Sequence, residues 1–451
     1  MKSLTKSKMW LFAIGQFGWS MLSGLISNWL VYFYQPNVAA QEGGQILFIP
    51  QGPVIFGVFT ILGAITALGR VFDAVTDPWI ASLSDRCKSK NGRRIPFLKW
   101  AALPLAVSTV MVFCAPVGKI STVNVVWLLV FVLSYYVSIT AYCTPYNALI
   151  PELGHDQKQR LDISTAISLT FIVGTAVAYA APVIWGTMEG SIGRVPAQRV
   201  TFMLLALIAF ICMLVPVFAI KEKEYVNSQP TEGNAISSLV KTFKNREFRI
   251  FVGSDIFYWI GLTMFQTGLP FFVTSLLGLD ETMSTIYFVS MTAISLVFYI
   301  PVNLLCRKFG KKRLVVLAFA IFAIAFAYTG FMGNALGIPA TVQGFILVVV
   351  AAFPMAIFGI LPQAMVADIS ESDSKQTGEN REGMFYAART FAFKLGQSVS
   401  MLLFTALATI GGGSGQGYRV VAFVSAALAL LGGIILLFYN EVKLNRVIQG
   451  Q

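Results

Sequence analysis

The chain has 451 residues, of which 56% are hydrophobic and 12% are charged, with a formal net charge of +12. Soluble domains carry about 25% charged residues, so this chain has too few to cover a water-facing surface of its size. The composition excludes a soluble globular protein and predicts an integral membrane protein.

Apolar blocks of roughly 20 to 28 residues recur along the chain, which is the length that a helix needs to cross about 30 Å of hydrocarbon. We expect an all-α membrane protein with two six-helix bundles, at 1–220 and 250–451, joined by a charged cytoplasmic linker at 221–249. In chain order, the twelve predicted membrane-spanning helices lie at about 9–34, 54–80, 96–117, 123–150, 162–188, 200–220, 250–277, 283–306, 312–333, 340–367, 384–410 and 418–439.

Lysine and arginine are concentrated at both termini and in every second loop. The opposite loops hold Lys119, Arg194, Arg199 and Arg419. The positive-inside rule therefore predicts a multi-pass protein of the plasma (inner) membrane with both termini in the cytoplasm. This bias accounts for the basic net charge, so we expect the lipid bilayer as a partner and no nucleic acid. No removable signal peptide is expected at the N-terminus.

The linker and the two halves show an internal pattern. Within the linker, apolar residues at helical spacing predict an amphipathic helix, either on the membrane surface or as a plain connector: Ile236, Leu239, Val240 and Phe243. Glycine-containing basic loops follow spans 2 and 8, and spans 4 and 10 end in similar proline-to-acid segments, 145–152 and 362–368. These similar segments, six spans apart, indicate parallel six-helix repeats, with a substrate site between them near the membrane midplane.

Three charged residues share one stripe of span 2. Arg70, Asp73 and Asp77 are spaced by three and four residues, which places them on one face of a helix. Ionisable residues inside a span are expensive and indicate function. One arginine neutralises only one of the two carboxylates, so the stripe predicts a net negative site for Na⁺ or a proton. The alternative is a structural Arg–Asp clamp.

Span 11 contains two basic residues, Arg389 and Lys394. By helical rise, Asp73 lies about 18 Å from the cytoplasmic boundary and Lys394 about 15 Å, so both reach a similar depth. We interpret Lys394 as a partner that senses the acidic site, or as a fixed counter-ion. Arg389 either contacts substrate or extends to the loop. Asp255 is expected at the membrane interface rather than in an ion pair.

Charged residues of the loop after span 2 predict a cytoplasmic gate latch, the alternative being charges that only set topology. The proposed gating residues are Arg70 together with Asp85, Arg86, Arg93 and Arg94. Enzyme signatures are absent, since the single histidine, His155, lies in a loop and no metal or nucleotide motif is found. We expect a monomeric transporter, not an enzyme, with no cofactor other than a coupling cation.

Several motifs occur together in both halves. They are Arg70-x-x-Asp73-x-x-x-Asp77-Pro78, Ser84-Asp85-Arg86, Gly92-Arg93-Arg94-x-Pro96, Pro145-Tyr146-x-Ala148-Leu149-x-Pro151-Glu152, Met365-x-Ala367-Asp368, Arg381-Glu382-Gly383-Met384-Phe385-Tyr386 and Lys394-Leu395-Gly396-Gln397. This set resembles the glycoside–pentoside–hexuronide:cation symporters of the major facilitator superfamily. The resemblance implies the major facilitator fold and cation-driven solute uptake by alternating access. It also implies a cation site of Asp73, Asp77 and Thr140, and a cavity lysine at Lys394.

The chain departs from melibiose permease, a member of that family. Ser20, Cys143, Asn147 and Ser168 stand where that permease has two acids, an aromatic and an arginine, so galactoside recognition is disfavoured. The polar residues offered to substrate instead are Gln16, Ser20, Asn28, Tyr136, Asn147, Gln266, Gln363 and Arg389. The function predicted is import of a sugar or glycoside, neutral or anionic. A lysophospholipid carrier and a non-transporting membrane sensor are the alternatives.

Overall fold

The computed structural model describes residues 4–154, 157–225, 242–378, 382–412 and 415–449. The chain divides into two compact units, Met1–Glu232 and Gly233–Gln451. Most of the predicted amphipathic linker helix, including Ile236, Leu239 and Val240, lies outside the described residues.

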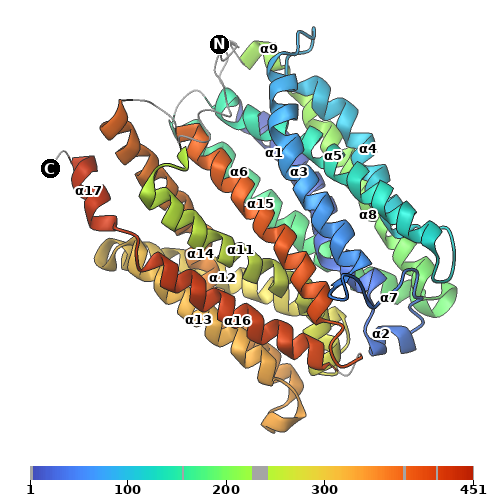
Figure 1. The fold of residues 1–451 in the computed structure, drawn as a ribbon. Helices are drawn as coiled ribbons and strands as arrows, with labels where there is room; N and C mark the ends of the chain where they lie inside the picture. The colour runs from blue at the N-terminus through green and yellow to red at the C-terminus, as the bar shows by residue number, and fades with distance from the viewer. Residues whose placement is uncertain (1–3, 155–156, 226–241, 379–381, 413–414, 450–451) are drawn as a thin grey trace. The chain divides into compact units, whose positions relative to one another are not determined.

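Unit 1 is a helical bundle with one small hairpin in its first long loop (Figure 1). Its elements are α1 (Lys6–Tyr34), α2 (Val38–Glu42), β1 (Pro53–Ile55), β2 (Phe59–Thr60), α3 (Ile61–Asp85), α4 (Ile95–Phe113), α5 (Thr122–Leu153), α6 (Gln157–Tyr179), α7 (Ala181–Ile192), α8 (Arg194–Ala219) and α9 (Glu222–Tyr225).

Unit 2 repeats the bundle without the hairpin. Its elements are α11 (Arg246–Phe271), the π-helical turn η1 (Phe272–Leu276), α12 (Thr282–Phe309), α13 (Lys311–Phe331), the 3-10 turn η2 (Asn334–Leu336), α14 (Ala340–Thr377), α15 (Glu382–Leu407), α16 (Gln416–Leu436) and α17 (Glu441–Gln449).

The two units pack their helices in the same pairs. In unit 1, α1 packs against α6 and α8, α5 packs against α3 and α4, and α4 packs against α8. In unit 2, α11 packs against α15 and α16, α14 packs against α12 and α13, and α13 packs against α16. Each pair of the first unit therefore has its counterpart in the second, as parallel repeats require.

Eleven helices among the described residues are long and apolar enough to cross a membrane. α3 is not one of the eleven, because Arg70, Asp73 and Asp77 interrupt its apolar run. Together with α3, every predicted span corresponds to a helix. Span 5 is split into α6 and α7 at Ala180, where Pro182 has no N–H with which to continue the preceding helix.

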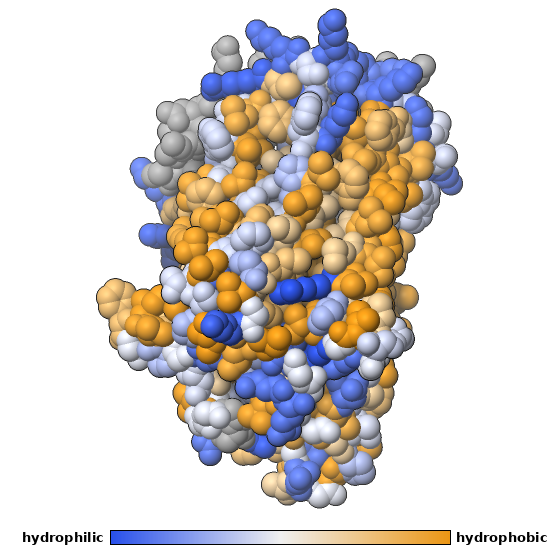
Figure 2. Space-filling model, turned by 90° about the vertical axis from the view of Figure 1, so that its right-hand side faces the viewer, coloured by the Kyte–Doolittle hydropathy of each residue, from blue (hydrophilic) through white to orange (hydrophobic). Residues whose placement is uncertain are grey.

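Large apolar side chains lie on the outer surface of several of these helices. Trp100, Phe218 and Ile300 are 77%, 74% and 73% exposed. Figure 2 shows apolar side chains over much of the length of one face and hydrophilic ones gathered at its top. Exposed apolar surface on this scale is unfavourable in water and is suited to lipid.

The predicted start of span 2 at residue 54 was wrong. Residues 53–60 form the hairpin β1–β2 instead, and α3 begins at Ile61. The turn contains Phe56 (φ +52°) and Gly57 (φ +68°), and the Val58 N–H donates to the Ile55 carbonyl at 3.1 Å. Positive φ at both central residues is the twist that two-residue hairpins favour, but Asn-Gly is the usual choice.

Candidate functional site

Two hydrogen bonds join the acids of α3 to hydroxyl groups of α5. The Thr140 hydroxyl donates to an Asp73 carboxylate oxygen at 2.5 Å, and the Thr144 hydroxyl donates to Asp77 at 3.0 Å. Asp73 and Thr140 are 5% and 2% exposed. Both pairs are one helical turn apart on both helices, so α3 and α5 present a ladder of four oxygen-bearing side chains. The structure thus brings together Asp73 and Thr140, as the resemblance implied.

Thr144 was missed by the sequence analysis. Its signal was present, because Thr140 and Thr144 repeat the four-residue spacing of Asp73 and Asp77. Two helices that pack against each other with matched spacings align their side chains turn by turn.

Arg70 lies one turn from Asp73 on α3 and covers an aromatic ring. Its guanidinium carbon is 5.4 Å from the centroid of the Tyr136 ring, and one of its N–H groups donates to the Ser27 hydroxyl at 3.4 Å. Tyr136 also packs so closely on Gly69 that a Cβ there would lie 2.5 Å from the ring. Tyr136 is 4% exposed, so the structure places this predicted substrate residue inside the bundle rather than on an open face.

The ladder has the chemistry of a site for a small hard cation. One guanidinium and two carboxylates leave a net negative charge, and all four ladder side chains offer oxygen atoms, which hard cations prefer. Among the described residues, no group of three or more His, Cys, Asp or Glu side chains is arranged to hold a metal ion. The arrangement therefore fits Na⁺ or a proton better than a transition metal.

The predicted substrate residues of α1 lie in the interior of unit 1. Ser20 is 1% exposed, and its hydroxyl donates to the Phe17 carbonyl at 3.1 Å. It also faces Gly174 of α6, where a Cβ would collide with it. This hydroxyl is used in helix packing in the structure, and Ser20 as a substrate contact stays a proposal. Gln16 is 3% exposed, and its side-chain oxygen has no hydrogen-bond partner among the described residues.

In unit 2, Arg389 and Asp255 form a buried ion pair. The Arg389 guanidinium donates two hydrogen bonds to the two Asp255 carboxylate oxygens, at 2.8 and 3.0 Å. Their side chains are 7% and 4% exposed, and the guanidinium also lies 5.8 Å from the Phe251 ring. The expectation that Asp255 lies at the interface was wrong. The Arg389 guanidinium is held by Asp255 of α11 and does not extend to the loop, and its contact with substrate stays a proposal.

Other polar candidates are more accessible. Lys394 and Gln266 are partly exposed within unit 2. Asn147 of α5 and Gln363 of α14 are exposed and each lies five residues before an acid, Glu152 and Asp368, in the two repeats. These four remain proposals as substrate contacts.

A tryptophan at the same place in both units was also missed. Trp19 and Trp259 are each the fourteenth residue of their helices, α1 and α11. Trp259 stacks on Phe393, which precedes Lys394, with ring centroids 4.5 Å apart, and Trp19 lies 6.1 Å from Phe171. Both indole N–H groups are buried without a hydrogen-bond partner among the described residues. Internal comparison of spans 1 and 7 would have revealed this repeat.

The proposed latch residues form a charged cluster at the end of unit 1 where α3 ends and α4 begins. Arg94 is 6% exposed, pairs with Asp85 at 2.5 Å and with Glu152 at 3.2 Å, and also donates to the Ser84 hydroxyl. Arg93 pairs with the same Glu152 oxygen at 3.2 Å. Arg86, in contrast, is exposed at the end of α3. The cluster links α3, α4 and α5.

Glu222, which the sequence analysis did not select, completes this cluster. Its carboxylate accepts the backbone N–H groups of Arg93, Arg94 and Ile95 at 2.7, 2.8 and 3.0 Å. These N–H groups lie at the start of α4 and have no hydrogen-bond partner within the helix. A negative charge at this end of the helix also interacts favourably with the helix dipole. Gly92 has φ +108°, and any Cβ there would collide with the Glu222 carboxylate.

In unit 2 a glutamate carboxylate likewise caps the start of a helix. The Glu441 carboxylate accepts the N–H groups of Lys311 and Lys312 at the start of α13, at 2.8 and 3.1 Å. Gly310 has φ +83°, and a Cβ there would collide with the Glu441 carboxylate. Lys311 pairs with Asp368 at 2.5 Å. An acid that follows the sixth span of each repeat was the sequence signal for both glutamates.

Comparison with known proteins agrees with this architecture. A family model described as MFS/sugar transport protein matches residues 11–440. The chain belongs to this family. The inward-open structure of the xylose transporter XylE from E. coli matches the fold of this chain with a TM-score of 0.68 at 16% identity. The match covers 98% of this chain and 99% of the XylE chain. The predicted all-α major facilitator fold is thereby confirmed.

Relatives in the family differ in what their names say they carry. The uncharacterized symporter YjmB of Bacillus subtilis (strain 168) is 27% identical over 418 residues, covering 89% of this chain and 85% of that protein. The isoprimeverose transporter of Lactiplantibacillus pentosus is 21% identical over 455 residues, covering 97% and 89%. The sodium-dependent lysophosphatidylcholine symporter 1-A of Danio rerio is 23% identical over 376 residues, covering 74% and 68%.

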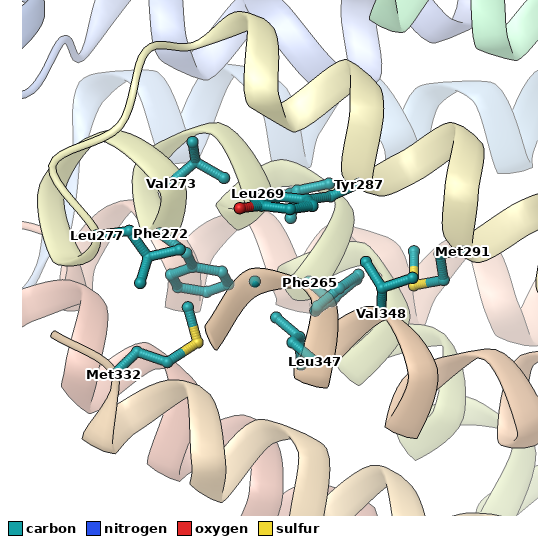
Figure 3. Close-up of a pocket in the computed structure, with 11 residues that line it drawn as sticks. Phe265, Leu269, Phe272, Val273, Leu277, Tyr287, Met291, Met332, Leu347 and Val348 are labelled. Atoms are coloured by element: carbon teal, nitrogen blue, oxygen red, sulfur yellow. The ribbon is translucent and has the colours of Figure 1, made fainter. Parts of the chain in front are cut away.

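Unit 2 contains a small apolar cavity. It lies among α11, η1, α12 and α14, and Figure 3 shows aromatic, aliphatic and methionine side chains pointing into it, among them Phe265, Tyr287 and Met291. Its volume is about 10 Å³, which barely admits one water molecule. The cavity therefore holds neither an acyl chain nor a sugar in this structure.

We expect Glu222→Gln to destabilise unit 1 measurably. A buried carboxylate that accepts three N–H groups would be replaced by a neutral amide that accepts with one oxygen, which costs about 1.5–3 kcal/mol for charge-assisted bonds. Thermal unfolding in detergent measures this loss. The control is Glu224→Gln, because Glu224 pairs with Lys221 at 3.6 Å and the two side chains are 35% and 74% exposed. Equal unfolding temperatures for both variants would contradict the capping role.

Proposed function

We propose that this chain is a cation-coupled secondary symporter that imports a sugar or glycoside by alternating access. The observation that carries the proposal is the buried Asp73–Thr140 pair beside Asp77–Thr144, inside a helix that crosses the membrane. A net negative, oxygen-lined site at this depth is expensive to maintain, and cation coupling gives it a purpose. The coupling ion is Na⁺ or H⁺.

The carried solute is a sugar by analogy with the isoprimeverose transporter and the family description. We favour a neutral glycoside over a uronide, because Asp255 neutralises Arg389 and leaves Lys394 as the accessible base of span 11. The competing proposal is a lysophospholipid, which the Danio rerio relative supports.

The topology is part of the proposal. Both termini lie in the cytoplasm by the distribution of basic residues, and the protein acts as a monomer in the plasma (inner) membrane. The helix-capping clusters around Glu222 and Glu441 then lie on the cytoplasmic side. Asp85 and Arg94 act there as a latch whose pairing changes between conformations.

Uptake into proteoliposomes tests the function directly. A panel of labelled mono- and disaccharides, uronides and lysophosphatidylcholine is offered while the Na⁺ gradient and the pH gradient are varied independently. We expect concentrative uptake of a neutral glycoside that one of the two gradients drives. Uronides should compete no better than their neutral parent sugars, in contrast to a site that selects anions.

Two results would overturn this proposal. Sodium-driven uptake of lysophosphatidylcholine with no sugar uptake would establish the lipid function. Sugar equilibration that neither gradient drives would show a uniporter and would remove the role assigned to the α3–α5 ladder.

A further inference from the structure

The hairpin β1–β2 stands out from unit 1 with an apolar tip. Phe56 is 91% exposed, and its neighbours Val54 and Val58 are 60% and 55% exposed. Phe56 is also the one non-glycine residue with positive φ among the described residues. An L-residue with a bulky side chain rarely adopts this backbone, and such strain persists where a function maintains it.

The rest of the loop is firmly attached to the bundle. Gln45 donates to the Phe33 carbonyl at 3.1 Å, and Gln51 donates to the Tyr34 carbonyl at 2.9 Å. Phe48 is 1% exposed and stacks on Phe33 with ring centroids 5.4 Å apart. The apolar residues of this loop are therefore divided into a buried group and an exposed tip, so the tip is a projection from a fixed base.

The hairpin leads without a break into a membrane-spanning helix. Thr60 ends β2 and caps α3, its hydroxyl accepting the Gly63 N–H at 3.0 Å. α3 has 25 residues, so its length of about 37 Å exceeds the hydrocarbon thickness of about 30 Å. Its first turn, and the hairpin attached to it, therefore reach the polar boundary of the bilayer.

The composition of this segment favours lipid over a protein or a soluble ligand. From Gly43 to Gly69 there is no charged residue, although loops outside the membrane are normally charged. Tryptophan, phenylalanine and leucine side chains of interfacial segments bury themselves at the boundary between headgroups and acyl chains. An aromatic residue flanked by two valines, with no charge nearby, matches that boundary.

We infer that the hairpin tip docks into the bilayer interface, in the leaflet on the side opposite to the N-terminus, with Phe56 as its anchor. The partner is the lipid surface that surrounds the spans. Docking fixes the outer end of α3, the helix that carries Asp73 and Asp77. This inference does not depend on which solute is transported.

The test uses the full-length protein in liposomes, with the five native cysteines replaced and uptake activity checked. A single cysteine, Val58→Cys, is labelled with an environment-sensitive fluorophore, which leaves the Phe56 ring in place. We expect strong quenching by phospholipids with a nitroxide near the headgroup, and loss of quenching by aqueous iodide. The control is Lys119→Cys in the next loop on the same side, an exposed position where iodide should quench and nitroxide lipid should not.

A second variant separates the anchor from the fold. Phe56→Asn suits the positive φ and creates an Asn-Gly turn, so the hairpin persists while the aromatic ring is removed. In this variant the label at Val58 should lose its quenching by nitroxide lipid and gain quenching by iodide.

Four outcomes would overturn the inference. They are iodide quenching at Val58→Cys as strong as at Lys119→Cys, unchanged lipid quenching at Val58 in the Phe56→Asn variant, a disulfide between two copies through Val58→Cys, and lipid quenching that disappears when substrate is added. The third would indicate a second copy as the occupant, and the fourth a lid.

Discussion

We expect Asp73→Asn to abolish concentrative uptake while leaving substrate exchange intact. The amide has the size of the carboxylate and still accepts the Thr140 hydroxyl, so the contact at 2.5 Å between α3 and α5 is retained. The variant loses the negative charge that attracts the coupling cation. Exchange of labelled for unlabelled substrate at equal concentrations does not require cation movement, so it should continue.

The measurement is the accumulation ratio in proteoliposomes under an imposed gradient. It should fall to equal inner and outer concentrations in Asp73→Asn, as in a vesicle without a gradient. Glu42→Gln is the control, since Glu42 is an exposed acid in the loop after α1 and removal of its charge should change nothing. Normal accumulation by Asp73→Asn would place the cation site elsewhere.

Thr140→Val refines this result. Loss of one hydroxyl that donates to a charged group costs about 1.5–3 kcal/mol. We therefore expect the half-saturating cation concentration to rise roughly tenfold or more. The maximal rate should change less than the half-saturating cation concentration. A larger change in the half-saturating cation concentration than in the maximal rate would indicate that Thr140 contacts the cation rather than only supporting helix packing.

Sequence reasoning selected the candidate cation-site residues because ionisable residues within a span are few. Arg70, Asp73 and Asp77 are conspicuous in an apolar helix, and helical spacing alone aligns them. Thr144 was missed because a threonine in a span is common, and its partner is known only when the packing of α3 on α5 is known.

The fold was predictable to the level of spans and repeats, but not of local geometry. The hairpin at 53–60 has the composition of a span, and hydropathy does not reveal the turn that Phe56 and Gly57 adopt. Arg389 and Asp255 are far apart in the sequence, and nothing in either span shows that α11 and α15 bring them together. Pairing between distant helices is the information that a single sequence lacks.

We expect removal of one partner of the Arg389–Asp255 pair to destabilise unit 2 severely, and removal of both to restore most of the loss. Breaking a buried pair from one side typically costs about 3–5 kcal/mol, because it leaves an uncompensated buried charge. Replacing the whole pair with apolar residues of similar volume is often neutral or stabilising. Arg389→Met and Asp255→Leu are therefore compared with the double variant by thermal unfolding in detergent.

A matched control lies in the same unit. Glu371 and Lys375 on α14 form a pair at 3.4 Å, but their side chains are 53% and 47% exposed. Exposed pairs contribute about 0–1 kcal/mol, so Lys375→Met should lower the unfolding temperature little. The contrast between Lys375→Met and Arg389→Met isolates the effect of burial from the effect of losing an ion pair.

The double variant also decides whether Arg389 recognises substrate. If the pair only joins α11 to α15, the variant transports, and neutral sugars and uronides compete with the same relative strength as in the parent. If Arg389 selects an anionic solute, uronides lose their advantage whenever Arg389 is absent, even where stability is restored. A stable single Arg389→Met variant with an altered competition profile would contradict the structural role, because a residue committed to Asp255 cannot be removed without leaving that carboxylate buried alone.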